Sequence, residues 1–251
     1  MNLKKRMKEK KLVFGTWCLI PSAEVINVIA KSGLDYVIID MEHGSMDFAL
    51  VQRMVMAAEA EGCEAIVRVG SNDELEILRA LDTGASGVIV PHIECVSDCR
   101  KAISYAKYPP IGIRGFSPYA RAGGYTSQKG YTVLANEKIL VGIIIESEEG
   151  IKNISEIIDQ PDLDIVYVGT YDISSSLGVP GDVTNIKVLQ ILEECVDKIR
   201  KAGKVAGCLF HSSDELAYFK KIGIGFMVYK VDSSVLFDGF SKVREEKGEV
   251  N

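Results

Sequence analysis

Short, uninterrupted runs of apolar residues recur along the chain and alternate with longer segments in which apolar residues return every three or four positions. An uninterrupted run is typical of a parallel strand buried on both faces, whereas the wider spacing is typical of an amphipathic helix. The pattern therefore predicts strands and helices in alternation. The predicted strands cover residues 13–18, 36–40, 65–68, 87–90, 139–145, 165–168, 204–209 and 225–229.

Helix-starting and helix-ending residues flank the amphipathic segments. Ser22 and Ser45 can each cap the start of a helix through the side-chain oxygen, and Gly62 and Gly203 are suited to helix ends. The stretch 108–137 is rich in Pro and Gly, so we expect it to be irregular. The predicted helices cover about residues 22–31, 45–62, 73–82, 97–107, 150–158, 189–199 and 233–246, with one more that begins at 213.

Eight strands that alternate with eight helices in 251 residues predict a single-domain (β/α)8 TIM barrel over residues 1–251. A doubly wound parallel sheet is the alternative. Eight regular units in a chain of this length favour the closed barrel over the open sheet.

Composition and charge narrow the classes of function. The chain is 47% hydrophobic and 25% charged with a formal net charge of −6, which argues against nucleic acid or an anionic membrane as its main partner. No apolar run approaches the roughly 20 residues that span a bilayer, and the basic start lacks a signal-peptide core. We therefore expect a cytoplasmic protein. The 6 cysteines form no C-x-x-C pair, so free and mostly buried thiols are expected.

Titratable and polar side chains collect where the predicted strands end. The active sites of barrel enzymes lie at the carboxyl ends of the strands, so these residues are the candidates for chemistry. The strand-end residues are Asp40, Glu42, His43, Arg68, Glu146, Thr170, Tyr171, Asp172, Lys230 and Asp232.

Glu146 and Asp172 are expected to face each other from neighbouring strands. Two carboxylates without a nearby cysteine suit a hard divalent cation such as Mg²⁺ or Mn²⁺, with Co²⁺ as a further candidate. The alternatives are a salt bridge for Glu146 and a helix N-cap for Asp172.

Arg68 and His43 are the candidates for substrate binding and proton transfer. A guanidinium can bind a substrate carboxylate through two parallel hydrogen bonds, although Arg68 could instead pair with a neighbouring acid. A histidine can act as a general base near neutral pH, or it can be an ordinary loop residue. Because His92 and His211 also follow strands, position alone does not select His43.

Five motifs spread over the chain carry a family resemblance. They are Asp-Met-Glu-His-Gly at 40–44, Val-Arg at 67–68, Leu-Asp-Thr-Gly at 81–84, Tyr-Pro-Pro-Ile-Gly-Ile-Arg-Gly at 108–115 and Ile-Glu-Ser at 145–147. Together they are similar to those of the HpcH/HpaI aldolases, a family of metal-dependent pyruvate aldolases that includes 4-hydroxy-2-oxoheptanedioate and 2-dehydro-3-deoxyglucarate aldolases.

The resemblance implies a (β/α)8 barrel that assembles as a homohexamer. It implies that Glu146 and Asp172 bind the metal, that His43 is the catalytic base and that Asp82 is its acidic partner. Asp82 ends a predicted helix, so it should lie at the opposite end of its own barrel from His43. We therefore expect Asp82 to reach His43 of a neighbouring subunit, with the loop around Arg114 at the same interface.

The resemblance also implies the substrate-binding residues. Arg68 matches the arginine that holds the carboxylate and keto oxygen of pyruvate, and residues 170–172 are expected to contact substrate as well. Three positions depart from the usual family pattern: Ile144 replaces a glutamine, Tyr171 stands where a small residue is common, and Lys230 also replaces a small residue.

The leading hypothesis is a carbon–carbon lyase that reversibly cleaves a 4-hydroxy-2-oxo acid to pyruvate, or a related 2-oxo acid, and an aldehyde. Asp40 and Glu42 then support the site without taking part in the reaction. The alternatives are a citrate-lyase-type or malyl-CoA-lyase-type enzyme on the same fold, a Schiff-base enzyme that uses Lys230, and a ligand-binding homologue that has lost turnover.

Overall fold

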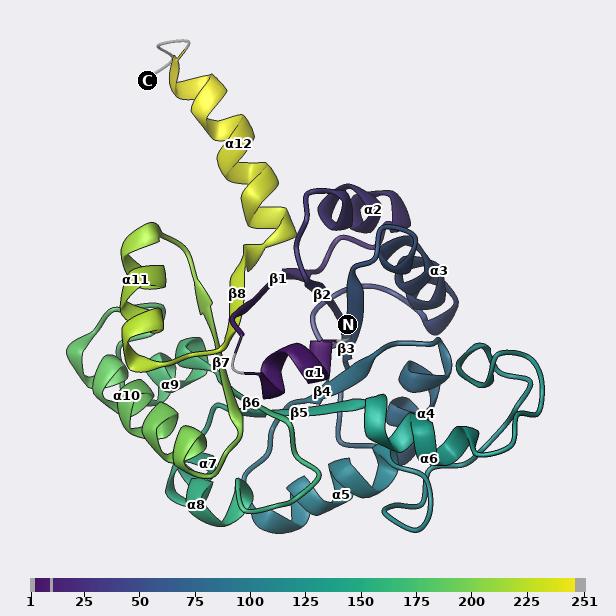
Figure 1. Ribbon diagram of the computed structural model, residues 1–251. Coiled ribbons are helices and arrows are strands. Elements are labelled where there is room, and N and C mark those ends of the chain that lie inside the picture. Colours follow the sequence, from purple (N-terminus) through teal and green to yellow (C-terminus); the bar gives the residue numbers. More distant parts are fainter. Residues whose placement is uncertain (1–2, 10, 247–251) are drawn as a thin grey trace.

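The computed structural model describes residues 3–9 and 11–246, in which eight parallel strands close into a barrel (Figure 1). Each strand pairs with the next along the chain, and the last pairs with the first. The predicted barrel is confirmed and the doubly wound sheet was the wrong alternative. The strands are β1 (Val13–Cys18), β2 (Tyr36–Asp40), β3 (Glu64–Arg68), β4 (Gly87–Val90), β5 (Leu140–Ile145), β6 (Ile165–Val168), β7 (Val205–Phe210) and β8 (Phe226–Val231).

Helices surround the barrel, and most of them lie where the apolar spacing predicts them (Figure 1). The helices are α1 (Leu3–Lys8), α2 (Ala23–Lys31), α3 (Phe48–Glu59), α4 (Glu74–Asp82), α5 (Val96–Ala106), α6 (Tyr131–Lys138), α7 (Glu148–Lys152), α8 (Ile154–Ile157), α9 (Thr170–Ser176), α10 (Ile186–Lys201), α11 (Ser213–Ile222) and α12 (Asp232–Glu246), with a 3₁₀ helix, η1 (Arg121–Gly123).

The two predicted serine caps have different outcomes. Ser22 caps α2 as expected, because its side chain accepts a hydrogen bond from the backbone N–H of Val25 at 3.2 Å. Ser45 does not cap α3. Asp47 does so instead, and its carboxylate accepts from the N–H of Leu50 at 2.7 Å. Both residue types are good caps, so local sequence alone could not choose between them.

Four helical regions differ from the prediction, and one of them is α9, where no helix was predicted. The predicted helix at 150–158 is two short helices, α7 and α8, that meet at Asn153, whose side chain donates to the carbonyl of Glu94 in another loop at 2.9 Å. The stretch 108–137 is not wholly irregular, since it contains η1 and most of α6. Val133 and Leu134 of α6 are exposed, so this helix lacks the apolar stripe that would have revealed it.

The helix α1, which was also not predicted, closes the amino end of the barrel. Leu3 and Met7 are buried together with side chains of the barrel interior, such as Tyr36 and Phe226, whose rings stack with centroids 4.1 Å apart. Gly15 makes room for this packing, because a Cβ atom there would lie 2.3 Å from the ring of Tyr36. The interior is thus filled, and chemistry is left to the carboxyl end of the barrel.

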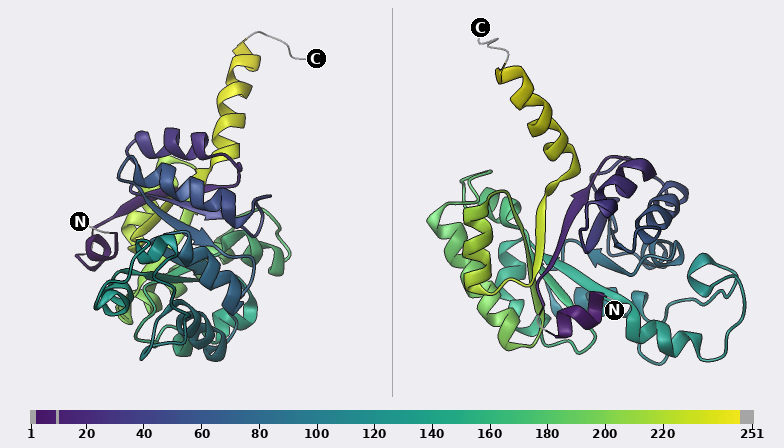
Figure 2. Two further views of the ribbon diagram at one scale, coloured as in Figure 1. Left: turned by 90° about the vertical axis from the view of Figure 1, so that its right-hand side faces the viewer. Right: turned by 45° about the horizontal axis from the view of Figure 1, so that its top comes forward.

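The helix α12 leaves the barrel and points away from it (Figures 1 and 2). Its exposed apolar residues are Val235, Leu236, Phe237, Phe240 and Val243. None of the helices in the described ranges is both long and apolar enough to cross a membrane. The six cysteines are free, and all except the half-buried Cys95 are buried, as predicted.

Candidate active site

Arg68 lies at the centre of a charged group at the carboxyl end of the barrel. It ends β3 directly opposite Asp40, the last residue of β2. Its Nε donates to Oδ1 of Asp40 at 2.9 Å, Nη2 donates to Oδ2, and Nη1 lies 2.9 Å from a carboxylate oxygen of Glu42. The guanidinium also lies over the ring of Trp17, 4.5 Å from its centroid. These contacts fix the orientation of Arg68, as the supporting role of Asp40 and Glu42 requires.

His92 joins this group to the predicted metal site, and sequence reasoning did not select it. Its Nε2 lies 2.9 Å from Oε1 of Glu42, and its Nδ1 lies 2.9 Å from Oε1 of Glu146. Its backbone N–H also donates to Glu146 at 2.8 Å. The residue has a φ of 58°, an uncommon value for a residue with a side chain, and this conformation turns the ring back toward the site.

Glu146 and Asp172 follow the neighbouring strands β5 and β6. Glu146 directly follows β5 and is largely buried, while Asp172 lies in the exposed first turn of α9 after β6. Burial raises the pKa of Glu146, the hydrogen bond from the His92 backbone opposes this, and the charge of Asp172 adds to the rise. The charge of Asp172 therefore acts on the Glu146 carboxylate. Asp172 is not the N-cap, because Gly169 has that position.

Gly169 leaves the space that Glu146 occupies. A Cβ atom at this position would lie 2.7 Å from Cβ of Glu146.

Within residues 3–9 and 11–246, no three or more His, Cys, Asp or Glu side chains are grouped so that they could hold a metal ion. An ion held by Glu146 and Asp172 alone would have most of its coordination positions left to water or substrate.

His43 and Asp82 are not brought together within the chain. His43 is exposed, and its backbone N–H donates to Asp40 at 3.3 Å. Asp82 is the last residue of α4, and its carboxylate accepts from Nη2 of Arg114 at 2.8 Å. The side chain of Arg114 is fully buried and lies over Tyr108, with Cζ 4.6 Å from the ring centroid. Asp82 is thus held by its own chain, away from His43.

Tyr171 belongs to a second polar group beside the acid pair. Its hydroxyl lies 3.0 Å from Nε2 of His211, and Nδ1 of His211 lies 3.2 Å from a carboxylate oxygen of Glu215. Because a carboxylate can only accept, Nδ1 carries the proton toward Glu215, and in the neutral ring Nε2 accepts from the tyrosine hydroxyl. This bond holds the half-exposed Tyr171 ring in place at the edge of the site.

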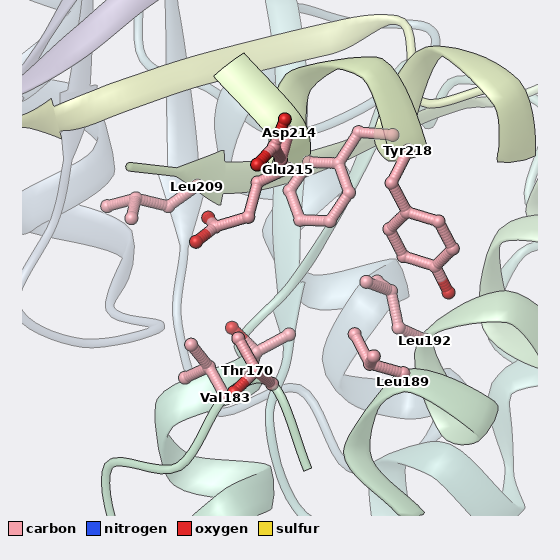
Figure 3. A pocket seen from close by; sticks show the side chains of 10 residues that line it. Thr170, Val183, Leu189, Leu192, Leu209, Asp214, Glu215 and Tyr218 are labelled. Atoms are coloured by element: carbon pink, nitrogen blue, oxygen red, sulfur yellow. The ribbon is translucent and has the colours of Figure 1, made fainter. Parts of the chain in front are cut away.

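Thr170 faces a small cavity behind this group (Figure 3). The cavity has a volume of about 170 Å³. Leu189 and Leu192 of α10 line one side of it, and Glu215 of α11 also lines it (Figure 3). The buried Thr170 therefore borders an apolar space next to the predicted substrate site.

Lys230 does not have the surroundings of a Schiff-base lysine. It is half-buried and its ammonium donates to Asp238 of α12. That hydrogen bond raises the pKa of Lys230, whereas an imine-forming lysine needs a lowered pKa. The carboxylate of Asp232 instead has a structural role, since it accepts from the N–H groups of Leu19 and Ile20 at 3.0 Å each.

A closed eight-stranded barrel with an acid pair and a fixed arginine at the carboxyl ends of its strands defines a (β/α)8 barrel enzyme. A model of the HpcH/HpaI aldolase/citrate lyase family matches residues 14–237, so the chain belongs to that family.

Two curated relatives and one solved structure show how close the likeness is. The chain is 29% identical to the 2-dehydro-3,6-dideoxy-6-sulfogluconate aldolase of Pseudomonas putida over 230 residues. This match covers 92% of this chain and 90% of the relative. It is 30% identical to the 4-hydroxy-2-oxo-heptane-1,7-dioate aldolase of Shigella flexneri, over 94% of this chain and 88% of the relative.

The crystal structure of an HpcH/HpaI aldolase from Desulfitobacterium hafniense DCB-2 has a TM-score of 0.94 and 26% identity, over 100% of this chain and 98% of that one. The predicted family and the predicted class, an aldolase-type carbon–carbon lyase, are both confirmed.

Proposed function

We propose that this enzyme reversibly cleaves a 4-hydroxy-2-oxo acid to pyruvate, or a close 2-oxo acid, and an aldehyde, with a divalent cation bound by Glu146 and Asp172. One observation carries the proposal. Three carboxylates, those of Asp40, Glu42 and Glu146, share one guanidinium and one imidazole at the carboxyl end of the barrel, and the charge of the exposed Asp172 acts on Glu146. That excess of negative charge at a largely buried position favours a bound cation.

The donor set fits Mg²⁺ or Mn²⁺, with Co²⁺ as a further candidate. Both donors are carboxylates, the pKa of Glu146 is raised by burial and by Asp172, and a cation would relieve both effects. When bound, the ion supplies positive charge that stabilises the enolate of the 2-oxo acid.

Arg68 binds the 2-oxo acid in this proposal. Its Nε and one Nη2 proton are used by Asp40, so the edge formed by Nη1 and Nη2 keeps donors for the carboxylate and keto oxygens of the substrate. Glu42 lies beside Nη1 and must share that edge. The buried contact with Asp40 keeps the guanidinium at one angle, which is the condition for effective binding of a planar carboxylate.

His43 takes the proton of the 4-hydroxyl group during cleavage and returns it in the reverse direction. The ring is exposed at the carboxyl end of the barrel, where a substrate can reach it. Its acidic partner is Asp82 of a neighbouring subunit, because Asp82 of the same chain lies at the end of α4 and is bound to Arg114. The carboxylate would select the tautomer of His43 and stabilise its protonated form.

Exposed apolar surfaces support an assembly, and we propose a homohexamer. The stretch 108–137, which contains Arg114, exposes several apolar side chains, and the helix α12, which projects from the barrel (Figure 2), carries a further exposed apolar set. The exposed residues of 108–137 include Ile111, Ile113, Phe116, Tyr119 and Tyr125. Surfaces of this kind on a water-soluble enzyme are typical of subunit contacts.

A complementation experiment tests the shared site. His43→Ala and Asp82→Ala are each expected to be inactive alone. When the two chains are co-expressed and assemble at random, about a quarter of the sites regain both residues, and activity returns in that proportion. Absence of any recovery in assemblies shown to contain both chains would exclude the trans arrangement.

The reaction class is tested by exchange of the methyl protons of pyruvate for deuterium, followed by NMR with and without Mn²⁺ or Mg²⁺. Metal-dependent exchange is expected, and it should disappear in Glu146→Ala, while Glu148→Ala on the nearby surface serves as the control. If the folded protein showed no metal-dependent exchange, the proposal would be refuted and a ligand-binding homologue that has lost turnover would be favoured.

A further inference from the structure

A cavity of about 580 Å³ lies at the amino end of the barrel, opposite the candidate active site. It is enclosed by α1 and by the turns that precede β6, β7 and β8. Figure 1 shows α1 across this end of the barrel. A space of this size is in the range of small-molecule sites in proteins.

The charge around the cavity is opposite to that of the whole chain. The protein carries a formal net charge of −6. The lining contains two acidic residues, Asp162 and Asp164, and a larger set of basic ones. The basic lining residues are Lys4, Lys8, Lys11, Arg200, Lys204 and Lys220. An anionic molecule would therefore meet a local excess of positive charge in a concave site.

Two of these cations are held in place by backbone carbonyls and make no direct ion pair among the described residues. The ammonium of Lys204 donates to the backbone carbonyls of Gln160 and Pro161, and Nη1 of Arg200 donates to the carbonyl of Ile222 at 3.2 Å. Carbonyls satisfy hydrogen bonds but do not neutralise charge. Lys4 differs, since it forms an ion pair with Asp164 at 2.9 Å.

The positions of these two cations are set by the fold. A Cβ atom at Gly223 would lie 2.5 Å from Cζ of Arg200, so the guanidinium rests directly on the glycine backbone. Burial lowers the pKa of Lys204, and the charges of Asp164, Asp162 and Asp159 only partly oppose this effect. Arg200 lies in the last turn of α10, where a cation also balances the helix dipole, whereas Lys204 directly precedes β7 and has no such explanation.

We propose that this cavity binds a small organic polyanion, with phosphate or carboxylate groups held by Arg200 and Lys204 and a second anionic group held by Lys8. Guanidinium and ammonium groups recognise both kinds of oxyanion. The site is separate from the aldolase chemistry, because Glu146 and Asp172 lie at the other end of the barrel.

Calorimetric titration of the metal-free protein with inorganic pyrophosphate tests the proposal, and citrate is titrated in a second arm to distinguish phosphate from carboxylate ligands. One saturable site is expected. The double variant Arg200→Met, Lys204→Met should bind at least about tenfold more weakly. The control Lys152→Met, Lys201→Met removes the same number of positive charges from exposed ion pairs outside the cavity and should bind like the parent protein.

A milder variant separates binding from folding. Lys8 is exposed on α1, so Lys8→Glu should leave the fold intact and weaken pyrophosphate binding several-fold by charge reversal. Equal weakening in the Lys152→Met, Lys201→Met control would show that the binding is non-specific attraction. That result, or no saturable binding of either pyrophosphate or citrate, would overturn the proposal.

Discussion

Asp40 provides a quantitative test of how the charged group is held together. Its carboxylate is fully buried, binds the guanidinium of Arg68 through two hydrogen bonds and accepts from the backbone N–H groups of Glu42 and His43 at 3.0 and 3.3 Å. In Asp40→Asn the shape is kept but the charge is lost, so buried Arg68 keeps Glu42 as its remaining acidic neighbour.

The expected loss follows from burial. Removing one partner of a buried ion pair costs about 3–5 kcal/mol, whereas an exposed pair contributes less than about 1 kcal/mol. Asparagine can still accept the backbone hydrogen bonds, so we expect a loss of about 3 kcal/mol for Asp40→Asn. The matched control is Asp197→Asn, which breaks the exposed pair with Lys201 and should cost less than about 0.5 kcal/mol.

Urea unfolding of the three metal-free proteins at one protein concentration measures these free energies. Because Asp40 also orients Arg68 and the backbone of His43, pyruvate exchange in Asp40→Asn should fall roughly 10–100-fold. If Asp40→Asn loses no more stability than Asp197→Asn, the buried carboxylate does not hold the group together and the argument fails.

Three further predictions concern other parts of the chain. Burial lowers the pKa of Lys107 to about 8, so between about pH 8 and 10.5 the unfolded chain binds more protons than the folded chain. The free energy of unfolding of the parent protein should therefore rise with pH across that window. The rise should be about 2 kcal/mol larger in the parent than in Lys107→Met. Asp47→Ala should cost about 1 kcal/mol in urea unfolding by removing the α3 cap, while Ser45→Ala should leave the free energy unchanged; equal effects would contradict the assignment. Borohydride with pyruvate should trap no adduct at Lys230 by mass spectrometry, and Lys230→Met should keep its exchange activity; a trapped adduct would revive the imine mechanism.

The barrel strands could be predicted from the sequence because of where they lie. Strands buried on both faces need apolar residues at every position, and this requirement leaves an uninterrupted run such as residues 36–40. The helices α1 and α6 have a weaker apolar pattern in the sequence. α1 is a single short turn-and-a-half whose buried residues are Leu3 and Met7, and α6 buries only Ala135 and Asn136. Two buried positions are too few to show a periodicity.

The acidic residues of the site could be found for a similar reason. Glu146 directly follows a predicted strand, and in a barrel that position alone places it at the carboxyl end. The contacts of His92 could not be found in this way. They depend on a backbone with φ of 58° and on a ring that turns back to Glu42 and Glu146. Such a conformation is set by packing in three dimensions and has no signature in local sequence.

Together these contacts explain why we assign the proposed metal site to Glu146 and Asp172 and not to the acidic ending of β2. Asp40, Arg68, Glu42, His92 and Glu146 form a continuous chain of contacts in which acidic and basic groups alternate. Asp40 and Glu42 are occupied by Arg68 within this chain, so they serve to position it. Glu146 shares His92 with Glu42, and the exposed carboxylate of Asp172 adds further negative charge beside it. The uncompensated charge therefore collects between β5 and β6, which is where a divalent cation would gain the most from binding.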